Sequence, residues 1–329
     1  MSYQLSHIAQ SYRGKTVLEI ESLTIADRAV VGIAGPNGSG KTTLLKLLAC
    51  LEKPHQGQLL YQGRSAAKEG ARLRREIALV HAEPYLLDRT VFENIAYGLR
   101  LRGESDRLGV RVEAALDQVG LVPQRFIRRK PFELSSGEAQ RVAIASRLVL
   151  EPKVLLLDEP TKSLDLGGTA LLARTLEAIR GQMTLVIASH DRSWIERLSD
   201  RMIYLFHGRQ SPHRPENFLM APFREDAQGW LRFEDSQMRL AIPPRTPRSV
   251  APMVPPDRIE LSRERPKQAE NRIRVKVVAL SCEPLTHRLV ITCQGAGGQF
   301  NIGALADQTP PQPGESLWLS FASSAIIWY

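Results

Sequence analysis

Short apolar runs, separated by stretches with helical spacing, organise the chain up to about residue 212. We expect strands over 17–20, 29–34, 77–80, 153–157, 184–188 and 202–206, and helices over 43–48 and 139–150. Runs without polar alternation are typical of strands buried on both faces, as in a parallel sheet covered by helices. The pattern therefore predicts an α/β domain over residues 1–212 with a mixed, mainly parallel sheet.

The pattern changes beyond residue 212. Prolines gather between 243 and 256, and strand-like runs follow over 274–280, 288–293, 316–321 and 325–328. Glycines at 295–298 and prolines at 310–314 are turn signals between these runs. We therefore expect a linker and a small all-β barrel over residues 213–329.

Composition narrows the class of protein. The chain has 329 residues, of which 43% are hydrophobic, enough for packed cores in about two domains. Its three cysteines, Cys50, Cys282 and Cys293, do not suit a secreted disulfide framework and favour a reducing cytosol. No apolar run reaches the roughly 18 residues of a membrane span. The net charge of +9 is compatible with a nucleic acid, an anionic lipid or a small anion as ligand, and also with ordinary solubility.

One glycine-rich segment has the spacing of a phosphate-binding loop. It lies between an expected strand and an expected helix, and it fits G-x-x-x-x-G-K-[ST] with Gly35, Pro36, Asn37, Gly38, Ser39, Gly40, Lys41 and Thr42. Glycines let backbone N–H groups turn toward a phosphate, and the following helix presents its positive end. Lys41 is placed to reach the β- and γ-phosphates, and the Thr42 hydroxyl is placed to hold Mg²⁺.

Further polar residues stand where a nucleotide site needs them. Asp158 and Glu159 end an apolar strand, so Asp158 is a candidate to hold Mg²⁺ through water and Glu159 to orient or deprotonate the attacking water. His190 follows the next strand and is a candidate to contact the γ-phosphate. The segment 135–138 begins a helix, where it serves as a simple cap or as a second phosphate contact.

These motifs, in this order, resemble the ATP-binding subunits of ABC transporters over about residues 1–212. The resemblance implies a P-loop ABC ATPase fold that binds ATP and Mg²⁺ through Gly35 to Thr43. It implies that Tyr12 stacks on adenine and that Lys41, Glu159 and His190 carry the catalysis. The signature loop then corresponds to Ser135, Ser136, Gly137 and Glu138, and the loop facing the partner subunit to 163–165, including Asp165.

The same resemblance implies a mechanism and a set of partners. Two copies meet head to tail, and each site is completed by the signature loop of the other copy. ATP closes the pair, hydrolysis reopens it, and the motion passes to transmembrane permease subunits, with an external substrate-binding protein as an indirect partner. We therefore expect a peripheral protein at the cytoplasmic face of the inner (plasma) membrane, with no nucleic-acid partner.

Two positions depart from the family pattern. Ala82 stands where the family has a glutamine in the lid loop. That glutamine is expected to relay the nucleotide state, so the relay is in doubt in this chain unless the neighbouring His81 substitutes for the glutamine. Ser136 replaces the usual signature glycine, and Glu138 is a common variant of glutamine. Neither change removes Lys41, so hydrolysis is still expected.

The end of the chain resembles the regulatory barrel, called TOBE or Mop-like, of many importer ATPases. The matching pieces are 256–262, 271 with 275–279, and 313–329, although Pro255 stands where an arginine is usual. The segments 83–87, 94–99 and 137–141 are most similar to tungstate- and molybdate-type importers. We therefore expect an importer subunit for a small solute, an oxyanion such as tungstate or molybdate, with a barrel that either binds the anion or only stabilises a dimer.

Three other functions stay open. A soluble ABC-type ATPase acting on ribosomes or nucleic acid suits the basic charge, but the chain has one phosphate loop and no sustained heptads. Ala82 favours an oxyanion-responsive regulatory ATPase, in which hydrolysis is weakened. An exporter subunit is disfavoured by the appended β region.

Overall fold

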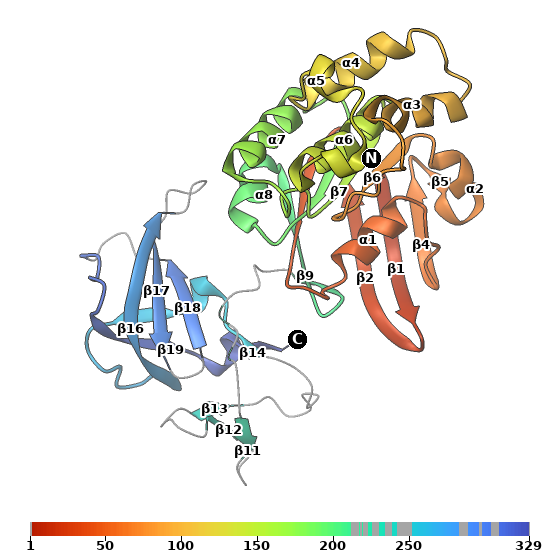
Figure 1. Ribbon diagram of the computed structural model, residues 1–329. Helices are drawn as coiled ribbons and strands as arrows, with labels where there is room; N and C mark the ends of the chain where they lie inside the picture. Colours follow the sequence, from red (N-terminus) through yellow and green to blue (C-terminus); the bar gives the residue numbers. More distant parts are fainter. Residues whose placement is uncertain are drawn as a thin grey trace. The chain divides into compact units, whose positions relative to one another are not determined.

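The computed structural model describes residues 2–211, 252–282, 289–295, 298–303 and 309–328, with short pieces at 217, 219, 223–225, 230–233 and 239–241. By its internal contacts the chain divides into two compact units, Met1–Gln210 and Ser211–Tyr329. In Figure 1 the first unit runs from red to green, and the described parts of the second are mostly blue.

A ten-stranded mixed sheet forms the centre of the first unit (Figure 1). Its strand order is β5-β4-β1-β2-β10-β9-β3-β8-β7-β6. The strands are β1 (Tyr3–Tyr12), β2 (Lys15–Ile25), β3 (Val30–Ala34), β4 (Gln56–Tyr61), β5 (Arg64–Ser65), β6 (Ile77–Val80), β7 (Val154–Asp158), β8 (Thr184–Ala188), β9 (Arg201–Phe206) and β10 (Arg209–Ser211). Strands β9, β3, β8, β7 and β6 pair in parallel, so the expected parallel sheet is confirmed in this half.

Two helices of this unit begin earlier than we predicted, namely those that follow the phosphate loop and the segment 135–138. The helices of the unit are α1 (Lys41–Leu48), α2 (Ala66–Leu73), α3 (Val91–Leu101), α4 (Leu108–Gln118), α5 (Pro123–Phe126), η1 (Pro131–Glu133), α6 (Ser136–Leu148), α7 (Leu166–Ala178) and α8 (Arg192–Leu198). Helix α6 starts three residues before the expected position 139, because Ser135 and Glu138 form a reciprocal capping box. Helix α1 starts at Lys41 rather than at residue 43, directly after Gly40.

Successive residues of the parallel strands face two separate cores. On β7, Leu155 and Leu157 pack into a core with residues of α3, α4, α6 and α7, whereas Val154 and Leu156 pack into a second core with α1 and the antiparallel strands. All five residues of β7 are buried. Burial on both faces is therefore confirmed for β3, β6, β7 and β8, all of whose residues are buried, but not for β2 or β9, which also carry exposed residues.

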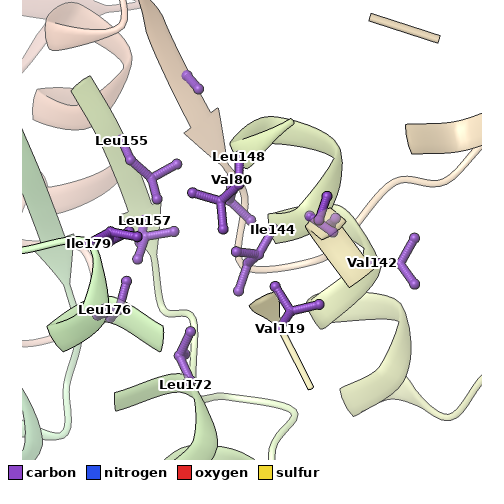
Figure 2. Close-up of a cluster of buried hydrophobic side chains, with 14 of the residues drawn as sticks. Val80, Val119, Val142, Ile144, Leu148, Leu155, Leu157, Leu172, Leu176 and Ile179 are labelled. Atoms are coloured by element: carbon purple, nitrogen blue, oxygen red, sulfur yellow. The ribbon is translucent and has the colours of Figure 1, made fainter. Parts of the chain in front are cut away.

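The first of these cores fixes helices α6 and α7 on the sheet. Figure 2 shows Leu155 and Leu157 of β7 among Ile144 and Leu148 of α6 and Leu176 of α7. These side chains are at most 6% exposed. The core thus holds the strand that ends in Asp158 against the helix that begins at Ser136.

Replacing Leu155 with alanine is expected to lower the free energy of unfolding by about 2–5 kcal/mol, because a fully buried leucine leaves a cavity. Denaturant-induced unfolding of the two proteins measures the difference. Leu166→Ala is the matched control: this side chain is 92% exposed, so its removal should change stability by less than about 0.5 kcal/mol. Equal effects of the two substitutions would contradict this description of the core.

The antiparallel half of the sheet was only partly predicted. The expected run 17–20 is the middle of the longer β2, and β1, β4 and β5 were not predicted at all. Strand β1 pairs antiparallel with both β2 and β4. Its side chains alternate between buried and exposed at its beginning, as at Tyr3 and Gln4, so it carries no continuous apolar run. This half of the sheet brings the end of β1 close to helix α1.

The second unit contains a five-stranded antiparallel sheet in the order β15-β19-β16-β17-β18. Its strands are β15 (Glu260–Ser262), β16 (Asn271–Cys282), β17 (Leu289–Gly295), β18 (Gly298–Gly303) and β19 (Ser316–Phe321). The runs predicted over 274–280, 288–293 and 316–321 match β16, β17 and β19, whereas β18 was not predicted. Closure of this sheet into a barrel stays a prediction.

Shorter elements complete the described part of the second unit. Strands β14 (Pro252–Met253) and β20 (Ile327–Trp328) pair with each other, and η2 (Pro256–Arg258) and η3 (Ser323–Ala325) are single turns. The run predicted over 325–328 is therefore a turn followed by a two-residue strand. A separate three-stranded sheet consists of β11 (Phe223–Glu225), β12 (Trp230–Phe233) and β13 (Arg239–Ala241).

Candidate functional site

The predicted phosphate loop lies between β3 and α1, and its glycines are required by its shape. A Cβ atom on Gly35 would lie 2.2 Å from the carbonyl oxygen of Leu205 and 2.5 Å from Ser39 Oγ. Gly38 and Gly40 have φ angles of +79° and +99°, in the region that side chains disfavour. The loop therefore turns tightly enough for its backbone to face a phosphate.

Lys41 is hydrogen-bonded to the start of this loop. Its ammonium donates to the carbonyl oxygens of Gly35 at 2.8 Å and Pro36 at 3.2 Å, and it lies 3.6 Å from Glu159 Oε1. The side chain is only 7% exposed. A buried cation that already contacts carbonyl and carboxylate oxygens is suited to bind a phosphate oxygen as well.

Asp158 and Thr42 meet across the gap between β7 and α1. The Thr42 hydroxyl donates to Asp158 Oδ2 at 2.8 Å. Burial raises the pKa of Asp158, and the bond from Thr42 opposes this rise. The other oxygen, Oδ1, is buried and has no hydrogen-bond partner among the residues that the structure describes. The Thr42 hydroxyl and the Asp158 carboxylate, which offers its Oδ1 as a further ligand atom, fit Mg²⁺. This ion prefers oxygen ligands and is usually held by one or two carboxylates together with the substrate's phosphates.

Glu159 connects this cluster to His190. Strands β7 and β8 are neighbours, and the backbone N–H of Glu159 donates to the carbonyl of Ala188 at 2.8 Å. Glu159 Oε2 lies 2.6 Å from His190 Nδ1 and accepts from the His190 backbone at 3.1 Å. Lys41, Glu159 and His190 thus form one contact chain, in which a carboxylate stands between an ammonium group and an imidazole.

The backbone at Glu159 is strained. Its φ is +44°, which for a residue with a side chain costs of order 1–3 kcal/mol. Strain of this kind persists only where the surrounding structure imposes it. It turns the Glu159 side chain, which is 13% exposed, toward Lys41 and His190.

Tyr12 lies at the end of β1. Its hydroxyl bonds to the Glu52 carboxylate, and its side chain also contacts Thr43 of α1. The side chain is 39% exposed. The structure therefore brings Tyr12 together with the loop residues, with part of its ring open to a ligand.

The predicted signature residues form a second, separate group at the start of α6. Ser135 Oγ accepts from the Glu138 backbone at 3.2 Å, and the Glu138 carboxylate accepts from the Ser135 backbone at 2.8 Å. A Cβ atom on Gly137 would lie 3.2 Å from the carbonyl oxygen of Ser163, so this helix start lies beside the loop 163–165. Asp165 caps α7 by accepting from the Gly168 backbone at 2.7 Å. Ser136 is exposed at the helix start, where backbone N–H groups are available to an anion.

The loop after β6, which carries the departure at Ala82, is linked to α6 by Gln140. The Gln140 side chain is 1% exposed, and its Nε2 donates to the backbone carbonyl of His81 at 3.5 Å. Burial is the largest cause of the raised pKa of Asp158, and an electrostatic contribution from His81 opposes it. We did not predict Gln140, although a glutamine two residues after Glu138, on the buried side of a capped helix, was a readable signal.

Comparison with known proteins agrees with this arrangement. The chain matches the model of the ABC transporter family over residues 18–162. The tungstate uptake system ATP-binding protein TupC of Peptoclostridium acidaminophilum is 36% identical over 212 residues, which cover 64% of this chain and 96% of that protein. The sulfate/thiosulfate import ATP-binding protein CysA of Xanthomonas campestris pv. campestris is 36% identical and covers 68% of each chain.

Solved structures show the same fold. The dimeric structure of MJ0796, a bacterial ABC transporter cassette, has a TM-score of 0.59 and 29% identity, covering 64% of this chain and 96% of that one. A second MJ0796 structure is a post-hydrolysis state bound to ADP and Pi. In the described part of our chain, no helix is long and apolar enough to cross a membrane. With the P-loop fold, the buried lysine and the two strand-end acids in place, this chain belongs to the ATP-binding subunits of ABC transporters and is an ATPase.

Proposed function

We propose that this chain energises the import of a small oxyanion, such as tungstate or molybdate, as the ATPase subunit of an ABC importer. The observation that carries the ATPase part is the contact chain from Lys41 through Glu159 to His190. The similarity to TupC over nearly all of that protein, and to the sulfate importer subunit CysA, supports import of an oxyanion.

Each predicted residue has a role in this proposal. Lys41 and the backbone of 35–43 hold the phosphates of ATP, and Tyr12 stacks on the adenine. Thr42 and Asp158 hold Mg²⁺, Asp158 through water, and the ion neutralises phosphate charge when bound. Glu159 orients or deprotonates the attacking water, and His190 supports the charge that develops at the γ-phosphate.

The separation of the signature group from this cluster supports a site completed by a second copy. The hydrogen bonds of Ser135, Glu138 and Asp165 stay within their own part of the domain. We propose a head-to-tail dimer in which Ser135, Ser136, Gly137 and Glu138 contact the nucleotide held by the other copy. The dimeric MJ0796 cassette supports this arrangement.

The second unit and the membrane partners complete the proposal. Segments of β15, β16 and β19 carry the pieces that resemble a TOBE or Mop-like domain, and these strands are neighbours in one sheet. We assign residues 1–212 to the nucleotide-binding domain and 213–329 to a linker and this regulatory domain. The chain then works at the cytoplasmic face of a membrane on permease subunits, which receive the anion from an external binding protein.

An uptake measurement in the native cells tests the proposal. Cells carrying the wild-type chain should accumulate tungstate or molybdate, measured by mass spectrometry of the metal, and cells carrying Lys41→Ala should not. Lys153→Ala is the control, because that lysine is 60% exposed and pairs with Glu76 away from the phosphate loop. Equal anion content in all three strains, or co-purification of the chain with ribosomes instead of a permease, would contradict oxyanion import.

A further inference from the structure

The side chain of Tyr12 lies at the end of a strand and is partly exposed. The residue ends β1, next to a turn in which Arg13 and Gly14 have φ angles of +50° and +78°, and its side chain is 39% exposed. An exposed aromatic side chain at a hairpin end has several rotamers available to it. A ring that has to receive a flat base in one orientation gains affinity when it is held in place beforehand.

The carboxylate of Glu52 supplies such a restraint. The Tyr12 hydroxyl donates to Glu52 Oε2, and Gln10 Nε2 donates to the same oxygen at 3.2 Å. The other oxygen, Oε1, lies 3.5 Å from the ammonium of Lys46. The Glu52 side chain is 26% exposed, so it is more restricted than an ordinary surface glutamate.

The loop that carries Glu52 is itself fixed to helix α1 and to β1. The backbone N–H groups of Leu51 and Glu52 donate to the carbonyl of Lys46 at 3.0 and 3.4 Å. The backbone of His55 donates to Gln10 Oε1 at 3.2 Å. Glu52 thus connects the end of β1 to the end of the helix whose first residue is Lys41.

We propose that Glu52 is a positioning residue for the nucleotide base: it holds the Tyr12 hydroxyl so that the ring stands ready to stack. This inference rests on the proposed role of Tyr12 in binding adenine. Glu52 acts through Tyr12 and does not contact the phosphates. Its removal should therefore weaken binding of ligands that have a base and spare those that have only phosphates.

Titration calorimetry with ATP and with inorganic tripolyphosphate, both without Mg²⁺ so that hydrolysis does not proceed, tests this directly. Glu52→Ala and Tyr12→Phe should each weaken ATP binding about 3–10-fold, because ordering one free side chain then becomes part of the cost of binding, and should change tripolyphosphate binding less than about twofold. Glu52→Gln should restore most of the ATP affinity, since its amide oxygen still accepts the bond. The variant carrying both Glu52→Ala and Tyr12→Phe should bind ATP no more weakly than either single variant.

The controls separate this inference from the role of Tyr12 itself. Glu177→Ala, at an exposed site on α7 that pairs with Arg180, should leave both affinities unchanged. Equal losses for ATP and tripolyphosphate in Glu52→Ala, no loss at all, or additive losses in the double variant would overturn the positioning role. If Tyr12→Ala also leaves the preference for ATP over tripolyphosphate intact, the base contact by Tyr12 fails as well.

Discussion

Glu159→Gln is expected to slow ATP hydrolysis by about 10²–10⁴-fold, the usual contribution of a positioned acid or base, while ATP still binds. Glutamine has nearly the same shape, so the strained backbone at φ +44° and the contacts to Lys41 and His190 can persist. It has no negative charge and cannot accept a proton from water. A steady-state phosphate-release assay, paired with calorimetric ATP binding, measures the two effects separately.

The same variant should accumulate a dimer in the presence of ATP, because hydrolysis is the step that reopens the proposed pair. Size-exclusion chromatography with and without ATP detects this shift. Glu83→Gln is the matched control: that carboxylate is 89% exposed and lies 3.4 Å from Lys162, so turnover should stay normal. Wild-type turnover in Glu159→Gln would remove Glu159 from the catalytic assignment.

Much of the parallel half of the fold could be predicted, because its strands are apolar throughout. Strand β7 has five buried residues and no polar interruption before Asp158. Strand β4 (Gln56–Tyr61) has exposed glutamines and only two fully buried side chains, so its sequence alone does not indicate a strand. Its pairing comes from β1, a neighbour more than 40 residues away in the sequence. Partners at that distance leave no local signal.

The site, like the fold, could be predicted only in part. The motif positions of Lys41, Asp158 and His190 indicated three residues near one edge of the sheet, and the structure does place Lys41 and His190 on the same carboxylate, Glu159. Three features were not predicted: the left-handed backbone of Glu159, the link from Gln140 to the loop after β6, and the bond from Tyr12 to Glu52. A φ angle depends on the tertiary environment, and a loop glutamate has no sequence pattern that reveals its partner.

Lys41→Ala is expected to weaken ATP binding by about 10–100-fold and to abolish measurable hydrolysis, since a hydrogen bond to a charged group contributes about 1.5–3 kcal/mol. The ammonium lies against two backbone carbonyls and Glu159, which also contacts the imidazole of His190. Without it, a phosphate entering the loop would meet the Glu159 carboxylate with no opposite charge between them. Repulsion then adds to the lost attraction.

Calorimetry with ATP and with ADP tests this electrostatic argument. If Lys41 chiefly contacts the β- and γ-phosphates, Lys41→Ala should cost more affinity for ATP than for ADP. Introducing Glu159→Gln beside Lys41→Ala should recover part of the lost ATP affinity, because it removes the carboxylate's charge. Unfolding curves that match the wild type show that the loop still folds. Equal losses for both nucleotides, with no recovery in the double variant, would mean that Lys41 supports the loop backbone through Gly35 and Pro36 rather than binding phosphate.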